Sequence, residues 1–407
     1  MRILFAPDKF KGSLSGAEAA RALAAGFRAG WPAAGRAEED DLEMECLPVA
    51  DGGEGTAEAL CDALGGRWIT RTVPDPLGRP VAARYALVEP ADGGGTLAVV
   101  EMSAASGFGL VTGDDRDLLR ANTVGTGELL RHARQQADVE RVLIGIGGSA
   151  TNDGGIGVAA ALGWRFLDAA GRELPPTPDE LENLASIAPP AAPWPADTLP
   201  IVIACDVRNP LLGPQGATAI YGPQKGLRGP DEQARLERAL TRLADVTATV
   251  IGRDLRDEPG AGAAGGLGFG LLAFCKATMR SGFEVVADLL RLEEAIARAD
   301  LVVTGEGSLD GQTLEGKAPC GVATLAGKYG KPVVAFGGRL DLAFTDQLAE
   351  VFDATFTLAP GPMTLADCQK RAAELLTNAA ARAARWLALG AKLDAAGGGF
   401  TAKTRSS

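Results

Sequence analysis

The stretch ILFAPDKFKGSLSGAE, residues 3–18, is the part of the sequence that decides the fold class. The apolar run at residues 3–6 predicts a β-strand, and a polar loop follows at residues 7–14. The sequence SGAE at residues 15–18 is a capping-box pattern, which predicts that a helix begins at Ser15. A strand, a loop and a helix in this order form the first half of a βαβ unit, so an α/β fold is expected.

The same alternation returns later in the chain. Strands are predicted at residues 43–47, 301–304 and 332–336, and helices at residues 128–137, 231–244 and 364–389. In the middle of the chain, short strands are joined by turn-forming sequences, which indicates a separate region. We predict a discontinuous Rossmann-like parallel-sheet domain at residues 1–68 and 285–390. A second α/β domain is inserted at residues 69–284, and residues 391–407 form a flexible tail.

Composition limits the partners and the compartment. The chain has 407 residues and a net charge of −12, which argues against nucleic acid and anionic membranes as partners. It contains no apolar run of about 18 residues, and its N-terminus resembles a first strand more than a signal peptide. The six cysteines form no C-x-x-C pair, which argues against a zinc site and indicates a reducing, cytoplasmic compartment.

The chain contains a single histidine, His132, within a predicted helix. Ser-His catalysis, Cys-His catalysis and a metal site built from histidines would all depend on this one residue. A solvated histidine on a helix face is the commoner case, so a general base is expected among Asp, Glu and Lys side chains.

Two loops that follow predicted strands combine charged residues with glycine, at the positions where open α/β sheets bind ligands. In DKFKGS, residues 8–13, Lys9 and Lys11 are placed to project on one side of an extended loop and hold an anion. In DGGEGT, residues 51–56, glycines let backbone N–H groups approach an anion at a helix N-terminus. A solvated charged loop and an ordinary helix N-cap remain the alternatives.

A third loop, GIGGSATNDGG at residues 145–155, matches the dinucleotide fingerprint G-x-G-x-x-A through Gly145, Gly147 and Ala150. The polar residues after it do not open a helix at once. The acidic residue at the expected offset, Asp168, follows a segment typical of a hairpin. A loop that binds phosphate or substrate is therefore favoured over a nicotinamide site.

A fourth loop contains the pattern G-x-x-x-x-G-K at residues 311–317. A P-loop needs Ser or Thr after the lysine, where this chain has Ala318, and the pattern begins well past the predicted strand end. A P-loop is therefore not expected. Lys317 remains a candidate for binding phosphate, and Glu306 and Asp310 are candidates for holding Mg²⁺.

Two further segments carry chemistry. The sequence GAGAAGGLGFG, residues 260–270, permits close backbone approach, either to a nucleotide or between a helix and a sheet. Asp206 ends a strand of buried character and is a candidate base or metal ligand, with a helix cap as the alternative.

Taken together, these loops resemble those of the type I glycerate kinase family. No single segment is decisive, and the ordered set across residues 1–385 carries the resemblance. The matching segments are APDKFKGS (6–13), PVADGGEGT (48–56), DPLGRP (75–80), GTGEL (125–129), IGGSATNDGG (146–155), GPQKG (222–226), GAGAAGGLGFG (260–270), GEG (305–307), LDGQT (309–313) and GKAP (316–319).

The resemblance implies a two-domain α/β enzyme with its active site in the cleft between the domains. It further implies MgATP and the small-molecule substrate D-glycerate, with ADP and 2-phospho-D-glycerate as products. Both a monomer and a homodimer stay open. The chain departs from the family pattern at Arg208, at Ser308, at Glu315 and in the run at residues 122–124 before Gly125. These departures affect the phosphate and glycerate contacts rather than the reaction class.

Phosphoryl transfer requires positioning and charge neutralisation more than covalent chemistry, and the candidate roles follow from that requirement. The catalytic candidates are Asp206, Asp51 and Lys9, with Asp206 favoured as the base. The substrate-binding candidates are Asp8, Lys9, Lys11, Ser13, Gly52 and Gly53. Lys225 is a second cation that could balance the charge of ATP, and Glu306 and Asp310 are the candidates for Mg²⁺. The candidates for binding ATP are Gly147, Gly148, Ser149, Thr151, Asn152, Gly262, Gly265, Gly266 and Lys317.

Two other classes of function remain as alternatives. An NAD-dependent 2-hydroxyacid dehydrogenase would use residues 145–150 for its cofactor, but the chain offers it no catalytic histidine at a strand-end loop. A non-enzymatic anion-binding protein would bind glycerate without consuming ATP. The combination of carboxylate-bearing loops with phosphate-like loops favours the kinase over both.

Overall fold

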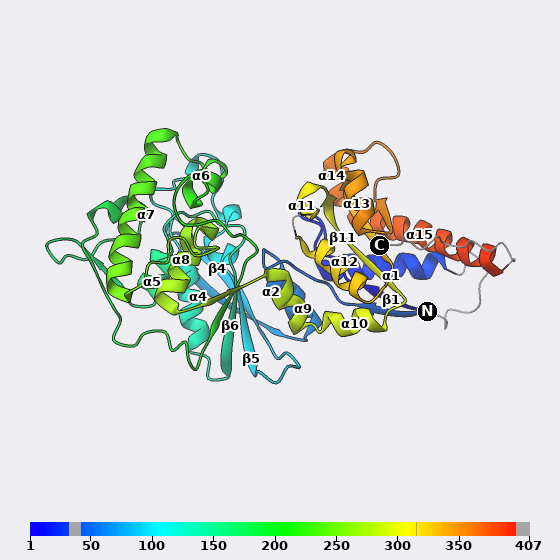
Figure 1. The fold of residues 1–407 in the computed structure, drawn as a ribbon, viewed down its shortest axis with the longest axis horizontal. Coiled ribbons are helices and arrows are strands. Elements are labelled where there is room, and N and C mark those ends of the chain that lie inside the picture. The colour runs from blue at the N-terminus through cyan, green and yellow to red at the C-terminus, as the bar shows by residue number, and fades with distance from the viewer. Residues whose placement is uncertain (32–41, 315, 396–407) are drawn as a thin grey trace. The chain divides into compact units, whose positions relative to one another are not determined.

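A computed structural model describes residues 1–31, 42–314 and 316–395 (Figure 1). Its contacts divide the chain into two compact units: unit 1 is Met1–Val49 with Arg291–Ser407, and unit 2 is Ala50–Leu290. The predicted boundary at residue 68 lies inside unit 2, because helix α2 (Thr56–Ala63) contacts strands of that unit. Each unit is described by itself below.

Unit 1 is built on a five-stranded parallel sheet in the order β13-β12-β11-β1-β2. The strands are β1 (Arg2–Phe5), β2 (Glu43–Cys46), β11 (Leu301–Leu309), β12 (Val333–Leu340) and β13 (Ala354–Thr357). Counted within the unit, this is the doubly wound order 2-1-3-4-5, in which the strand order reverses beside β1. The predicted α/β class is confirmed.

Both faces of this sheet are covered by helices, as a parallel sheet requires. Helices α1 (Gly16–Gly30) and α15 (Ala372–Ala395) pack against one face. There the rings of Phe5 and Phe27 pack edge-to-face, with their centroids 5.3 Å apart. Helices α10 (Leu292–Arg298) and α12 (Ala318–Lys328) contact β1 and β11 and cover the other face.

Local signals in unit 1 agree with the structure at its start and differ at its end. Ser15 caps α1, and the reciprocal bonds of the predicted capping box with Glu18 are present. The predicted helix at residues 364–389 is two helices, α14 (Leu365–Lys370) and α15, because Arg371 leaves helical geometry. Helix α15 continues through Ala395, so residues 391–395 are helical where a tail was predicted, and the rest of that tail lies outside the described residues.

Unit 2 contains a six-stranded mixed sheet in the order β10-β9-β6-β5-β4-β3. The strands are β3 (Arg67–Pro74), β4 (Pro80–Val88), β5 (Thr96–Glu101), β6 (Val139–Gly145), β9 (Ile201–Ala204) and β10 (Thr278–Arg280). The pairs β3–β4 and β4–β5 are antiparallel, whereas β5, β6, β9 and β10 run parallel. The hairpin expected before Asp168 is present as β7 (Arg165–Leu167) and β8 (Ser186–Ala188).

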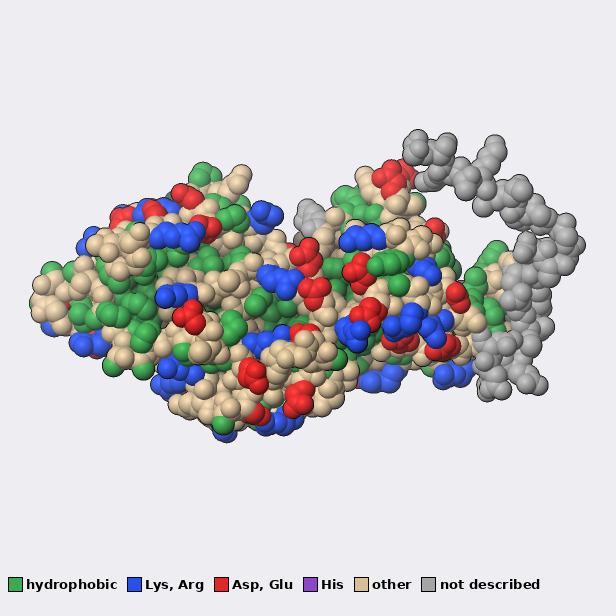
Figure 2. All heavy atoms as spheres, turned by 60° about the horizontal axis from the view of Figure 1, so that its bottom comes forward, with side chains coloured by type: hydrophobic (Ala, Val, Ile, Leu, Met, Phe, Trp, Pro, Cys, Tyr) green, Lys and Arg blue, Asp and Glu red, His purple; other side chains and the backbone are tan. Residues whose placement is uncertain are grey.

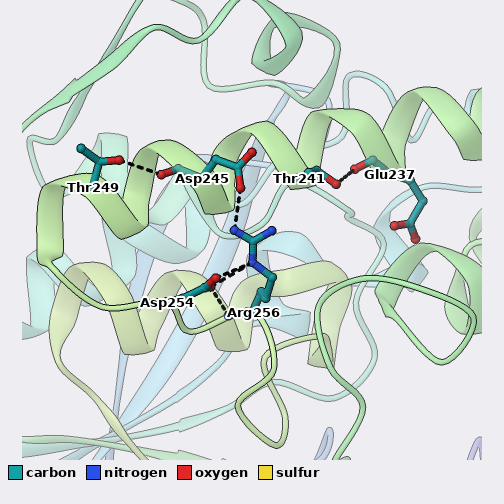
Figure 3. Close-up of polar contacts among 6 residues, drawn as sticks. All are labelled: Glu237, Thr241, Asp245, Thr249, Asp254 and Arg256. Carbon is teal, nitrogen blue, oxygen red and sulfur yellow. Dashed lines mark hydrogen bonds and ion pairs between the residues drawn. The ribbon is translucent and has the colours of Figure 1, made fainter.

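Helices line the core of unit 2: α4 (Val124–Arg134), α5 (Ile156–Ala161), α7 (Pro230–Ile251), α8 (Ala263–Cys275) and α9 (Gly282–Leu289). The 22-residue α7 is joined to the segment after it by Arg256, which pairs with Asp245 on the helix at 2.6 Å and with Asp254 at 2.7 Å (Figure 3). In the described residues, no helix has the length and apolar character needed to cross a membrane.

The contact between α1 and α15 leads to a stability prediction. A Cβ on Gly26 would overlap the carbonyl oxygen of Thr377 and press on the methyl group of Ala380. Gly26→Ala is expected to destabilise the fold by about 1–3 kcal/mol despite the better helix propensity of Ala, because the packing leaves no room. The matched helical control, Gly327→Ala, meets open space and is expected to be neutral or stabilising by up to about 1 kcal/mol. Thermal unfolding midpoints of the two variants test the prediction, and an undiminished midpoint for Gly26→Ala would contradict it.

Candidate functional site

The loop DGGEGT of unit 2 lies directly on the carboxyl ends of the parallel strands. A Cβ on Gly52 would lie 2.9 Å from Ala204 at the end of β9, and one on Gly147 would lie 2.9 Å from the Cα atom of Gly53. Gly52 also has a positive φ of 83°, which favours glycine. This close backbone packing holds Asp51 beside the strand end that carries Asp206.

Asp206 has a raised pKa at this edge of the sheet. Burial raises its pKa, hydrogen bonds from Ser281 and from the amide of Gly282 oppose the rise, and the charge of Asp51 adds to it. The Gly282 amide donates to Oδ1 of Asp206 at 3.0 Å. Two carboxylates close enough to repel, one with a raised pKa, form an arrangement suited to accepting a proton or binding a cation.

The partner carboxylate, Asp51, is fixed by its own loop. The amide of Gly53 donates to Asp51 Oδ1 at 3.1 Å. A Cβ on Gly282 would overlap the carbonyl oxygen of Asp51, so the start of α9 also contacts this loop. At the other end of the loop, the amide of Ala57 donates to Glu101 at 2.8 Å, so Glu101 satisfies a free amide at the start of α2.

The loop at residues 146–155 is divided into an accessible part and a buried part. Gly148 is exposed, whereas Gly147 and Ser149 are half-buried. Thr151 and Asn152, both predicted to bind the nucleotide, are fully buried. The accessible glycine stretch is therefore the part of this loop that a ligand reaches without rearrangement.

Asp153 organises the buried part of the loop. One of its oxygens accepts hydrogen bonds from the amide and the hydroxyl of Thr123, at 2.8 and 2.7 Å, and from the amide of Gly157 at 3.1 Å. The amide of Gly155 donates to the other oxygen at 3.0 Å. Burial nevertheless raises the pKa of Asp153. The carboxyl group thus joins the loop to Thr123, the N-cap of α4.

Lys225 lies in the same buried region. Its Nζ donates to the carbonyl oxygen of Thr151 at 2.8 Å, and the residue is only 4% exposed. Burial lowers the pKa of Lys225 to about 7, although the charge of Asp153 opposes this. Thr151 Oγ1 and Asn152 Oδ1 are buried without a hydrogen-bond partner among the described residues, an unusual state for polar atoms.

The glycine-rich segment 260–270 packs on this loop. A Cβ on Gly265 would overlap the carbonyl oxygen of Thr151, and one on Gly266 would lie 2.7 Å from Gly154. A Cβ on Gly262 would overlap the carbonyl oxygen of Pro210. All three glycines are buried, which favours the packing interpretation over direct contact with a nucleotide. Their assignment to ATP stays a prediction.

The first charged loop of unit 1 leaves the end of β1. Asp8 is 9% exposed, its amide donates to the Gly305 carbonyl at 2.8 Å, and its Oδ1 accepts from the amide of Lys9 at 2.7 Å. Residues 11–13 form a turn closed between Phe10 and Leu14, so the loop is not extended throughout as expected. Lys11 lies exposed in that turn. Ser13, also in the turn, donates its hydroxyl to the Phe10 carbonyl at 2.9 Å.

Glu306 lies near the end of β11, next to β1 in the sheet. It is 6% exposed, and burial raises its pKa. Its two oxygens accept from Thr313 at 2.7 Å and from Lys317 at 3.5 Å. Asp310 has a lowered pKa: its partial burial is outweighed by hydrogen bonds from Ser308 and two amides and by the charge of Lys317.

The segment that matched the P-loop pattern is not a P-loop. Strand β11 extends to Leu309, so the expectation that the pattern begins well past the strand was wrong. The pattern fails for another reason, because the short helix α11 (Gly311–Leu314) occupies the interval between the strand and α12. Lys317 instead precedes α12 as its N-cap residue. Glu315 lies outside the described residues.

Several residues at these sites were not predicted from the sequence: Glu101, Ser281 and Thr313. Ser281 follows a strand and caps a helix, with its hydroxyl accepting from the Glu284 amide at 3.4 Å, so a Ser-Gly pair after a short strand was an available signal. Glu101 accepts from a residue 44 positions away, a separation that no local pattern reveals, whereas Thr313 lies only seven residues from Glu306.

The sequence profile of the glycerate kinase family matches residues 3–388. The chain belongs to this family. A "Glycerate kinase" of Bacillus subtilis strain 168 is 44% identical over 93% of this chain and 96% of its own length. The "Glycerate 2-kinase" of Escherichia coli K12 is 41% identical over 96% of this chain and 99% of its own length. A crystal structure of a protein provisionally named glycerate kinase 2, from Salmonella typhimurium LT2, is 44% identical, covers 97% of this chain and all of its own, and superposes with a TM-score of 0.82.

Family membership confirms the prediction of a kinase, an enzyme that transfers a phosphoryl group from ATP to glycerate. It gives no support to a nicotinamide-dependent dehydrogenase or to a non-enzymatic anion-binding protein. Acidic and basic side chains are intermixed on the face shown in Figure 2.

Lys225 supplies a test of the buried part of this family loop. Its pKa is about 7 in the folded state and 10.5 when unperturbed, so between these values the unfolded chain binds more protons. The stability of the wild type relative to Lys225→Met should therefore rise between pH 7 and about pH 9, by on the order of 1 kcal/mol per pH unit. Thermal midpoints at the two ends of this range measure the effect. Lys328→Met, at an exposed helical lysine, should show no such pH dependence, and an equal result for both variants would refute the prediction.

Proposed function

We propose that this chain is a D-glycerate kinase that transfers the γ-phosphoryl group of ATP to the 2-hydroxyl group, giving 2-phospho-D-glycerate and ADP. The proposal extends the family assignment to one enantiomer and one hydroxyl group. It is supported by the Escherichia coli relative, 41% identical over nearly the whole of both chains, whose name specifies a 2-kinase.

The observation that carries the chemical part of the proposal is the pair formed by Asp51 and Asp206 at the carboxyl ends of β6 and β9. Asp206 is partly buried and has a raised pKa, so its carboxylate holds a proton more readily than a solvated one. In the proposed reaction it accepts the proton of the glycerate hydroxyl group. The hydroxyl oxygen bonds to the γ-phosphorus, the bond from that phosphorus to the β–γ bridging oxygen breaks, and ADP leaves.

The charged groups of unit 1 complement these carboxylates in their chemistry. Lys9 and Lys11 follow β1, and Lys317 follows the neighbouring β11, at the strand ends where the sheet order reverses. Ligands of doubly wound sheets bind at this position. The amides and lysines of the first loop are candidates for binding a carboxylate, and Lys317 is a candidate for binding a phosphate group.

The accessible glycines of unit 2 are the remaining candidates for phosphate contacts. Gly147, Gly148 and Ser149 offer backbone amides without an intervening side chain, as a close approach to phosphate requires. Thr151 and Asn152 lie beneath them and are assigned to supporting the loop rather than to touching the nucleotide.

Mg²⁺ accompanies ATP in phosphoryl transfer and neutralises charge on its phosphates. The described residues contain no cluster of three or more His, Cys, Asp or Glu side chains suited to a metal. Mg²⁺ in kinases is bound by one or two carboxylates together with substrate phosphates, so a pair is sufficient. Because Asp206 is assigned as the base, the carboxylates left for Mg²⁺ are Asp51 at the same edge of the sheet and Glu306 and Asp310, whose oxygens also accept hydrogen bonds within their own loop.

The cytoplasm is the proposed location. All six cysteines are free, as in a reducing compartment. Glycerate and ATP are small polar substrates, and the proposal requires neither nucleic acid nor a membrane as a partner.

The product distinguishes the proposed regiochemistry. With MgATP and D-glycerate, a coupled assay should record glycerate-dependent ADP release, and phosphorus NMR should identify 2-phosphoglycerate. Formation of 3-phosphoglycerate would retain the family activity and overturn the 2-hydroxyl assignment. L-Glycerate is the matched control for the enantiomer and should be turned over more slowly.

The role of Asp206 is tested by Asp206→Asn, which keeps the side-chain shape and removes the base. The expected result is a loss in kcat of about 10²–10⁴ with little change in the thermal midpoint. Asp288→Asn, at an exposed residue of α9 in an ion pair with Arg280, is the matched control and should keep full activity. Unchanged kcat in Asp206→Asn would remove Asp206 from the role of base.

A further inference from the structure

A second hollow on unit 2 involves none of the residues assigned above. It lies where the C-terminal half of α4 passes the edge strand β3, and its volume is about 320 Å³. Arg71 and Thr72 line it from β3, and Arg131, His132 and Gln135 from the end of α4. This volume falls within the range of small-ligand sites.

The lining of this hollow is rich in hydrogen-bond donors. Two guanidinium groups, a side-chain amide and a hydroxyl face it, and Glu128 is the single acidic side chain in the lining. Guanidinium groups supply several N–H donors in a planar fork that matches phosphate and carboxylate oxygens. A cationic hollow on a chain with a net charge of −12 is a local exception to the acidic composition.

The two arginines are weakly engaged by the protein. Within the described part of the chain, Arg71 makes no ion pair, and its guanidinium group donates a hydrogen bond to the neighbouring Thr70 carbonyl at 3.3 Å. Arg131 lies 3.7 Å from Glu128 and 3.5 Å from the Ala161 carbonyl. By contrast, Arg141 on the same sheet meets Asp92 at 2.6 Å. The guanidinium groups of the hollow are therefore available to an external anion.

The pKa of His132 reflects the charges around the hollow. Its Nδ1 lies 2.8 Å from the hydroxyl of the fully buried Tyr85, which fixes the ring against the core. Partial burial lowers the pKa of His132, and the charge of Arg71 lowers it further. A bound anion would offset the arginine charge and favour the imidazolium form.

The hollow is remote from the phosphate-like loop. The N-cap of α4, Thr123, bonds to Asp153 in that loop, whereas the hollow is at the opposite end of the helix. The α4 residues of the lining, Glu128 to Gln135, follow Thr123 by 5 to 12 positions, which corresponds to about 8–18 Å along the helix axis. An anion in the hollow would therefore occupy a site distinct from the loop that includes Gly147–Gly155.

We propose that this hollow, lined by Arg71, Arg131, His132 and Gln135, is a binding site for a small phosphate-bearing anion. The two guanidinium groups bind the phosphate oxygens, and the Gln135 amide adds a donor. The ring nitrogens of His132 lie against Tyr85 and Gln136, so the imidazole senses the charge of the anion. Inorganic phosphate and a small phosphate ester share this chemistry. The site is independent of the reaction proposed above, since its residues take no part in it.

The single histidine makes the test specific. In protein carrying ¹³C-labelled histidine and no histidine tag, only His132 contributes a ring signal. Its titration midpoint is measured between about pH 5 and 8 by NMR, in chloride and in inorganic phosphate at equal ionic strength. Phosphate is expected to raise the midpoint by about one unit in a saturable manner, because the anion stabilises the charged ring.

Variants separate a built site from general screening. In the double variant Arg71→Gln, Arg131→Gln, the phosphate-dependent rise should be lost, while the thermal midpoint and glycerate-dependent ADP release stay at wild-type levels. Arg165→Gln, at an exposed arginine paired with Glu173 on the hairpin, is the matched control and should keep the rise. No rise in the wild type, or an equal rise in the double variant, overturns the proposal.

The source of the anion is distinguished by a second titration. Glycerol 3-phosphate replaces inorganic phosphate under the same conditions. Half-saturation at a lower concentration of the ester assigns the site to a phosphate ester, and half-saturation at a lower concentration of inorganic phosphate assigns it to the free ion. Failure of both probes to move the His132 signal rejects the site.

Discussion

The contact on which the candidate site depends is one between backbones, with no side chain interposed. The loop that carries Asp51 lies against the ends of β6 and β9 only because Gly52, Gly147 and Gly282 have no Cβ at the points of contact. A single methyl group at any of them would move the loop, and with it the carboxylate, away from Asp206. The electrostatic coupling between the two acids is thus a product of packing rather than of sequence proximity.

Features that depend on neighbours in the sequence could be predicted, whereas those that depend on the assembled fold could not. The capping box at Ser15 and the strand at the N-terminus follow from local patterns, and the structure has both. The break at Arg371 interrupts a segment whose composition favours helix throughout, so the sequence there does not predict a break. The length of β11 is set by its pairing with β12 as far as Leu309, which a short apolar run does not reveal.

The candidate site shows the same division. Asp206 and Asp51 could be selected because carboxylates after strands converge at one edge of a parallel sheet. The sequence could not show that Thr151 and Asn152 lie fully beneath the surface, because their burial is made by Lys225 and the glycine-rich segment, more than 70 residues away. Glycine density indicated close approach correctly but not whether the approaching group was a ligand or another part of the chain.

The sheet of unit 1 is built from two stretches of chain separated by unit 2, and this has a consequence for synthesis on the ribosome. Strand β1 is made first and β2 soon after it, yet the other partner of β1, β11, begins only at Leu301. Helix α15, which packs on α1, is the last helix of the described residues. Unit 2 is continuous in sequence and is complete before either appears. During translation the nascent chain therefore carries an apolar strand and an uncovered helix for some 250 residues of elongation, at a few residues per second to about 20. The opening segment is therefore exposed to chaperones and to premature association for much of its synthesis.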